Sequence, residues 1–91
     1  MAGVADQSLI PMGYQRITPS ASTALTIPTG GPRFAMFNID TATTYMKDDG
    51  TAASATSGIA LTAGTNYWYT GDLALVRFFS ATGVVNVLYY R

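Results

Sequence analysis

The 91-residue chain carries five basic and five acidic side chains, and its charged fraction of 11% is small beside a hydrophobic fraction of 48%. Its basic residues are scattered singly, which excludes the clustered positive surface that nucleic acid requires, and no apolar run approaches the ~20 residues of a membrane helix. The chain has neither His nor Cys, which excludes imidazole acid–base catalysis, Ser–His and Cys–His nucleophile pairs, disulfides and imidazole–thiolate zinc sites. We therefore expect no enzyme, no cofactor and no metal site, but a protein whose weakly charged surface favours association.

The first twelve residues have no sustained period of two or 3.6 residues, so the sequence predicts an extended N-terminal arm over residues 1–12. Leu9 and Ile10 are apolar side chains that a purely solvated tail does not need, and they make the arm a candidate for contact with a neighbouring subunit. A frayed terminus is the alternative. The remaining residues, 13–91, are expected to form a single β domain.

From residue 13 onward, Thr, Val, Ile, Phe, Tyr and Trp crowd into short runs that Gly, Pro and Asp separate. β-Branched and aromatic residues favour strands, and no long run shows a helical period. We therefore expect an all-β fold, a small antiparallel β-sandwich or barrel of about six to seven strands. The candidate strand segments are residues 13–18, 24–28, 33–40, 44–48, 58–61, 66–70, 73–80 and 84–90.

The alternation within two of these segments indicates which side chains form the core. In segment 33–40, Ala35, Phe37 and Ile39 share one face. In segment 84–90 both faces are largely apolar, as expected for a strand that is buried on both sides. A domain this small has little other chain with which to cover both faces. We therefore expect a homo-oligomer, with a trimer favoured, in which another chain covers one of them.

Asp48, Asp49 and Gly50 end the fourth candidate strand and are the main candidates for acidic chemistry. Asp–Gly is a tight-turn pair, because Gly accepts a positive φ and Asp bonds nearby amides. The two carboxyl groups of a glycosidase face each other across a cleft, whereas neighbouring side chains on a turn point apart. The run also lacks the spaced acidic ligands and the Glu of an EF-hand loop. We interpret it as a solvated hairpin turn.

The aromatic run Tyr67-Trp68-Tyr69 predicts a contact surface. Because alternate residues of a strand point to opposite faces, either Trp68 or the pair Tyr67 and Tyr69 is buried, and the other group is free for contact. We favour a protein interface for the outward group, since Tyr and Trp are enriched in such patches. A site that stacks on a glycan is the alternative.

Six short motifs follow one another along the chain in a specific order and spacing. They are G-Y-Q-R-I-T (13–18), A-L-T-I-P (24–28), K-D-D-G-T (47–51), G-I-A-L-T-A-G-T (58–65), Y-T-G-D-L-A-L-V-R-F (69–78) and V-N-V-L-Y-Y-R (85–91). Over residues 13–91 the chain resembles a group of small β-rich, virion-associated proteins of tailed bacteriophages and prophages. It departs from that pattern at Lys47, where Arg is frequent, and at Ala52-Ala53, where Pro-Thr is frequent.

The resemblance implies association with a virion. Together with the associating surface, it leads us to expect a capsid decoration (cement) protein on the capsid surface, made in the host bacterial cytoplasm, that binds between major capsid protein subunits. Two alternatives stay open: a neck, tail or head-fibre component, and a carbohydrate-binding module that aids host adhesion. The candidate interface residues are Leu9, Ile10, Tyr14, Trp68 and Tyr90.

Overall fold

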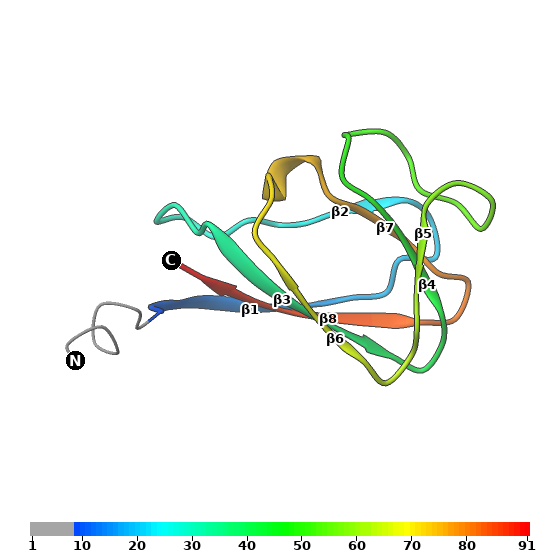
Figure 1. Cartoon of the computed structure of the whole chain (residues 1–91), viewed down its shortest axis with the longest axis horizontal. Coiled ribbons are helices and arrows are strands. Elements are labelled where there is room, and N and C mark those ends of the chain that lie inside the picture. Colours follow the sequence, from blue (N-terminus) through cyan, green and yellow to red (C-terminus); the bar gives the residue numbers. More distant parts are fainter. Residues whose placement is uncertain (1–8) are drawn as a thin grey trace.

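The computed structural model describes residues 9–91, in which eight strands form two four-stranded antiparallel sheets (Figure 1). The first sheet has the order β1-β8-β3-β6 and the second has the order β2-β7-β4-β5. The prediction of an all-β fold is confirmed, the architecture is a small sandwich, and the strand number exceeds the expected six to seven. The elements are β1 (Pro11–Ile17), β2 (Thr23–Ala24), β3 (Phe34–Asp40), β4 (Thr44–Lys47), β5 (Ile59–Leu61), β6 (Asn66–Tyr69), the 3-10 helix η1 (Leu73–Leu75), β7 (Arg77–Phe79) and β8 (Val84–Tyr90).

The core lies between the inner faces of the two sheets. The predicted set Ala35, Phe37 and Ile39 of β3 is fully buried. The ring of Phe37 meets Phe78 of β7 edge to face, with centroids 4.9 Å apart, and this contact joins the two sheets. The other buried hydrophobic side chains of the same cluster are Ile17, Leu61, Leu73, Val76, Val85, Val87 and Tyr89.

Segment 73–80, which the sequence predicts to be one strand, is divided. The Asp72 carboxylate accepts a hydrogen bond from the backbone N–H of Ala74 (3.0 Å) and caps η1, so that only Arg77–Phe79 pairs in the sheet. An Asp side chain can bond a nearby backbone N–H, and the backbone then forms a capped turn instead of pairing with a neighbouring strand. The predicted strand is therefore wrong in its first half. The predicted alternation survives at Val76 and Phe78, which are both fully buried.

Segment 24–28 also pairs less than predicted, since β2 ends at Ala24. Beyond it the chain passes β1, where Gln15 Oε1 accepts a hydrogen bond from the backbone N–H of Thr26 (3.0 Å). Leu25 packs partly against the core, whereas Ile27 is 38% exposed. The segment therefore closes one side of the sandwich more by side-chain contacts than by strand pairing.

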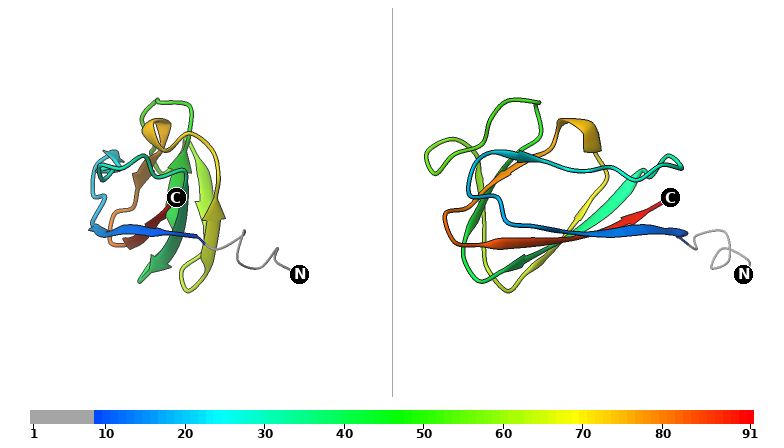
Figure 2. Two further views of the ribbon diagram at one scale, coloured as in Figure 1. Left: turned by 90° about the vertical axis from the view of Figure 1, so that its left-hand side faces the viewer. Right: turned by 180° about the vertical axis from the view of Figure 1, so that it is seen from behind.

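The N-terminal strand starts earlier than expected. β1 begins at Pro11, and Ile10 and Arg91 exchange two backbone hydrogen bonds of 2.9 Å that extend the β1–β8 ladder. The last three residues of the predicted arm, 10–12, therefore belong to this sheet edge, and residues 1–8 lie outside the described part of the chain. Both views in Figure 2 show the strand running along β8.

The same small substitution should lower the free energy of unfolding at a core isoleucine and leave it almost unchanged at a surface isoleucine. Ile39 is fully buried and Ile59 is 72% exposed, while both lie in strands. Ile39→Val should lower the free energy of unfolding by about 0.5–1.5 kcal/mol, because it removes a packed methylene group. Ile59→Val should leave it almost unchanged. Urea denaturation measures both, and equal losses would contradict the assigned core.

Candidate functional site

Large side chains line up across the outer face of the sheet β1-β8-β3-β6. Tyr14, Leu88, Met36 and Trp68 occupy consecutive strands in register, one on each strand. Because their chain neighbours point into the core, these four side chains point away from it. Tyr14 is 61% exposed and Trp68 is 51% exposed.

Two further aromatic rings enlarge this row. Trp68 stacks on Phe34, with ring centroids 6.2 Å apart, and lies 5.4 Å from the ring of Tyr90. Phe34 and Tyr90 are cross-strand partners, which fixes their rings side by side. We call the whole set the outer aromatic face; its members are Tyr14, Phe34, Met36, Trp68, Leu88 and Tyr90.

A hydrogen-bonded row of polar side chains borders the outer aromatic face. The Asn86 carbonyl oxygen accepts hydrogen bonds from the hydroxyl of Tyr14 (2.7 Å) and from Arg16 (3.2 Å). The Asn86 amide donates to Asn38 (3.1 Å), whose own amide donates to Asn66 (2.7 Å). The row crosses all four strands. It holds Tyr14 in place and provides a polar rim like those that surround protein interfaces.

The structure brings together three of the five predicted interface residues. Tyr14, Trp68 and Tyr90 lie on the outer aromatic face, and Trp68 is the outward member of the aromatic run. Leu9 and Ile10 are 38% and 51% exposed, and they precede β1 without joining the face.

The prediction missed three members of the outer aromatic face: Phe34, Met36 and Leu88. Their alternation with the buried residues of β3 and β8 was already visible in the sequence. This alternation is the sequence signal from which the three residues could have been predicted.

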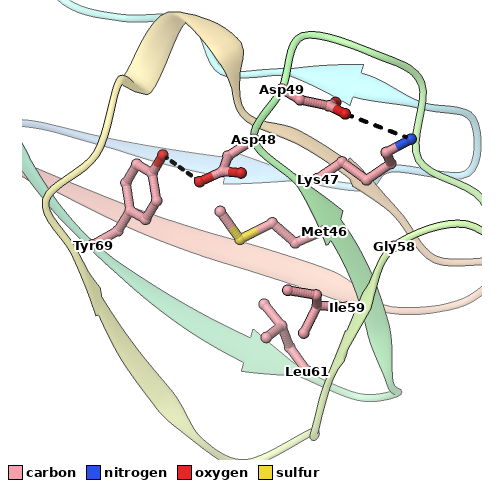
Figure 3. Close-up of a pocket in the computed structure, with 8 residues that line it drawn as sticks. All are labelled: Met46, Lys47, Asp48, Asp49, Gly58, Ile59, Leu61 and Tyr69. Carbon is pink, nitrogen blue, oxygen red and sulfur yellow. Dashed lines mark hydrogen bonds and ion pairs between the residues drawn. The ribbon is translucent and has the colours of Figure 1, made fainter.

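A groove of about 550 Å³ opens on another side of the sandwich, where β4 and β5 approach β6 (Figure 3). Met46, Ile59 and Leu61 form its apolar part, and the hydroxyl of Tyr69 donates to the Asp48 carboxylate across it (3.0 Å). The residues that line the groove are Met46, Lys47, Asp48, Asp49, Gly58, Ile59, Leu61 and Tyr69.

The acidic turn beside the groove has two differently engaged carboxylates. Asp48 accepts a hydrogen bond from Tyr69, whereas Asp49 lies 4.0 Å from the ammonium of Lys47 (Figure 3). Asp49 also accepts hydrogen bonds from the hydroxyl and the backbone N–H of Thr51. The Thr51 hydrogen bonds lower the pKa of Asp49 below its ordinary value. The two side chains point apart, but the predicted hairpin turn is wrong: β4 ends at Lys47 and β5 starts only at Ile59, so the two residues begin a long connection. In residues 9–91 no three acidic side chains gather closely enough to hold a metal ion.

Burial raises the pKa of Tyr69 to about 12, and the hydrogen bond and negative charge of Asp48 act in the same direction. The negative charge of Asp72 adds to this effect. The groove therefore combines the apolar side chains with a rim of two carboxylates, Asp48 and Asp49, and one ammonium group, that of Lys47. Such a lining favours contact with an apolar group that carries a neighbouring positive charge.

Comparison of the chain with protein-family models, with curated proteins and with solved structures found no match. Across the described residues, no helix has the length and apolar character needed to cross a membrane.

Replacement of Tyr69 should reduce the loss of stability at alkaline pH. The pKa of Tyr69 is about 12 in the folded chain against an ordinary value of 10.0, so the unfolded chain loses the phenolic proton first. The free energy of unfolding therefore falls as pH rises through this interval, and Tyr89, with a pKa of about 12 from burial, adds to the fall. In Tyr69→Phe the fall should be smaller. Denaturant titrations between these pH values measure it, and an unchanged slope would contradict the assignment.

Proposed function

We propose that this chain is a structural protein of a bacteriophage virion, specifically a capsid decoration protein that binds an assembled shell between major capsid protein subunits. The observation that carries the binding part of the proposal is the outer aromatic face. It spans four strands, and Trp68 and Tyr14 are more than half exposed on it. Contiguous exposed patches of this kind mark interaction sites. The resemblance of residues 13–91 to virion-associated phage proteins supports the assignment to a virion.

The N-terminal arm supplies the second set of contacts in this proposal. Leu9 and Ile10 expose apolar side chains at the point where the chain enters the sheet. The proposed contact residues toward the shell and toward other copies of the chain are therefore Leu9, Ile10, Tyr14, Trp68 and Tyr90.

The proposed mechanism is thermodynamic. A protein that binds only the assembled shell stabilises that state by mass action. The many equivalent positions of a symmetric shell, together with contacts between copies, make modest individual affinities sufficient. A small domain with a thin core also gains stability from the surface that its partners cover. No turnover is required, which agrees with a chain that lacks His and Cys.

A carbohydrate-binding role is the second candidate, and the exposure of Trp68 favours it. An aromatic ring that is 51% exposed, beside the amide row that ends at Asn66, provides both a stacking surface and hydrogen-bonding groups. Glycan-array binding by the purified chain that disappears in Trp68→Ala would support this role. Binding to shells without any glycan binding would exclude it.

The amount of the chain in purified particles tests the proposal directly. In particles from cells whose genome encodes the chain, quantitative mass spectrometry should find it at a molar amount comparable with that of the major capsid protein. A few copies per particle would instead indicate a neck, tail or head-fibre component. Absence from particles would refute a virion role altogether.

Substitutions in the arm should weaken attachment without unfolding the domain. The double variant Leu9→Ser/Ile10→Ser keeps the backbone pairing of Ile10 with Arg91 but removes two exposed apolar side chains. We expect its affinity for purified shells to fall at least about tenfold, with unchanged thermal stability. Ile27→Ser is a matched control, because Ile27 is 38% exposed, as Leu9 is, and lies outside the proposed contacts. Co-sedimentation with shells gives the affinities; equal binding of all three proteins would remove the arm from the mechanism.

A further inference from the structure

One aspartate of this chain is placed for a reaction with its own backbone. The nitrogen of the residue that follows an aspartate can attack the side-chain carboxyl group, and a glycine hinders that attack least because it has no Cβ. Asp49, which precedes Gly50, is the only acidic residue that is followed by a glycine. The residues that follow the other four are Gln7, Thr41, Asp49 and Leu73. Asp49–Gly50 is therefore the most reactive aspartyl position in the sequence.

The reaction is an isomerisation, and on balance it consumes nothing. The Gly50 nitrogen bonds to Cγ of the protonated Asp49 carboxyl group, and the amide proton leaves with the carboxyl hydroxyl as water. A cyclic succinimide remains. Water then adds to the Asp49 backbone carbonyl carbon and breaks its bond to the nitrogen, so that the main chain runs through the side chain as isoaspartate. Addition of water at Cγ restores aspartate instead.

The fold favours a glycine at position 50. Gly50 has a φ of 83°, in the left-handed region where other residues are strained. A Cβ at this position would also lie 3.2 Å from Cδ2 of Leu75. The segment that leads out of β4 therefore keeps an unhindered nitrogen beside Asp49 for a structural reason.

A hydrogen bond to η1 holds the attacking nitrogen. The Gly50 N–H donates to the backbone carbonyl of Leu75 (3.0 Å), the last residue of η1. Attack requires this proton to leave and the nitrogen to approach Cγ of Asp49, so the hydrogen bond must break first. The cap of η1 fixes the acceptor in turn, since Asp72 accepts the Ala74 N–H (3.0 Å). The nitrogen is thus unreactive as long as η1 and the segment after β4 stay together.

The Asp49 carboxyl group is restrained as well. Its Oδ1 accepts hydrogen bonds from the hydroxyl and from the backbone N–H of Thr51. These hydrogen bonds lower the pKa of Asp49, and the charge of Lys47 acts in the same direction (Figure 3). A carboxylate has no hydroxyl group to lose as water, so the anion does not form the succinimide. The side chain is 61% exposed, so these contacts restrain the reaction and burial does not.

We propose that Asp49–Gly50 is a latent site of isoaspartate formation, which is blocked in the folded chain and released when residues 48–58 separate from η1. Isoaspartate adds a methylene group to the main chain, and the carboxyl carbon of Asp49 becomes a backbone carbonyl. The hydrogen bonds to Thr51 and Leu75 then cannot form again in the same geometry. The modification therefore accumulates with the number of openings. The proposal does not depend on a virion role.

Incubation of the full chain with and without guanidinium chloride, in one buffer and at one temperature, tests the proposal. Isoaspartate should form at least about tenfold faster in the denaturant, because the folded chain reacts only through its open fraction. Digestion followed by mass spectrometry with electron-transfer fragmentation distinguishes isoaspartate from aspartate and gives the modified position. Hydrogen exchange of the folded chain should also show a slowly exchanging Gly50 amide.

Two substitutions should release the reaction in the folded chain. Thr51→Val removes the hydroxyl that donates to Asp49, and Asp72→Ala removes the cap of η1. Each should raise the rate at least about twofold, as expected for the loss of one hydrogen bond. Thr56→Val is a matched control, because its hydroxyl lies in the same connection and pairs with that of Ser54. In guanidinium chloride all four proteins should react at the same rate.

Three outcomes would overturn the proposal. Equal rates with and without denaturant, or a rapidly exchanging Gly50 amide, would show that the fold does not block the site. Isoaspartate formed chiefly at another position would show that Asp49 is not the reactive residue. Unchanged rates in both folded variants would remove the contacts with Thr51 and η1 from the mechanism. Circular dichroism identifies a variant that does not fold, and the wild-type comparison and hydrogen exchange then decide.

Discussion

Neighbouring residues of a strand point to opposite sides, and in β3 and β8 this rule divides large apolar side chains into two sets. One set, which includes Phe37 and Val87, is fully buried between the sheets. The other set, which includes Met36 and Leu88, has no second sheet to cover it. Alternation places the second set on the exposed side of the strands whose first set forms the core, so the core and the outer aromatic face are two sides of the same strands.

On the exposed side of the sheet β1-β8-β3-β6, a row of hydrogen-bonded amide side chains interrupts the apolar surface. The row consists of Asn86, Asn38 and Asn66. Asn86 and Asn38 form hydrogen bonds across the sheet where further large side chains would otherwise extend the patch. Amide groups carry no net charge, so they limit the patch without repelling a partner of either sign. Charge enters at the margin, through Arg16, Arg33 and Asp40.

Most of the fold was predictable because alternation is a local property of the sequence. The strands that bury Ile39 and Val85 follow from it directly. The division of segment 73–80 did not, because it depends on whether Asp72 caps a turn or stays in a strand, and its side chain permits both.

The orientation of the aromatic run around Trp68 was equally open. Both of its faces carry rings, and only tertiary packing decides between them. The groove could not be predicted at all. It depends on contact between Asp48, which follows β4, and Tyr69 of β6 in the other sheet, and no sequence period reports how two sheets meet.

The place of β8 in the first sheet has a consequence for how the chain is made. This strand lies between β1 and β3, yet it follows all the other described strands in the sequence. Until it is made, β1 and β3 have no common partner, and their unpaired edges stay available to other chains. The pairing of β1 and of β3 with β8 must therefore wait until β8 has been synthesised, and each β1–β8 pair joins residues that lie far apart in the sequence. A central strand that is synthesised late therefore prolongs the stage at which unpaired strand edges can aggregate.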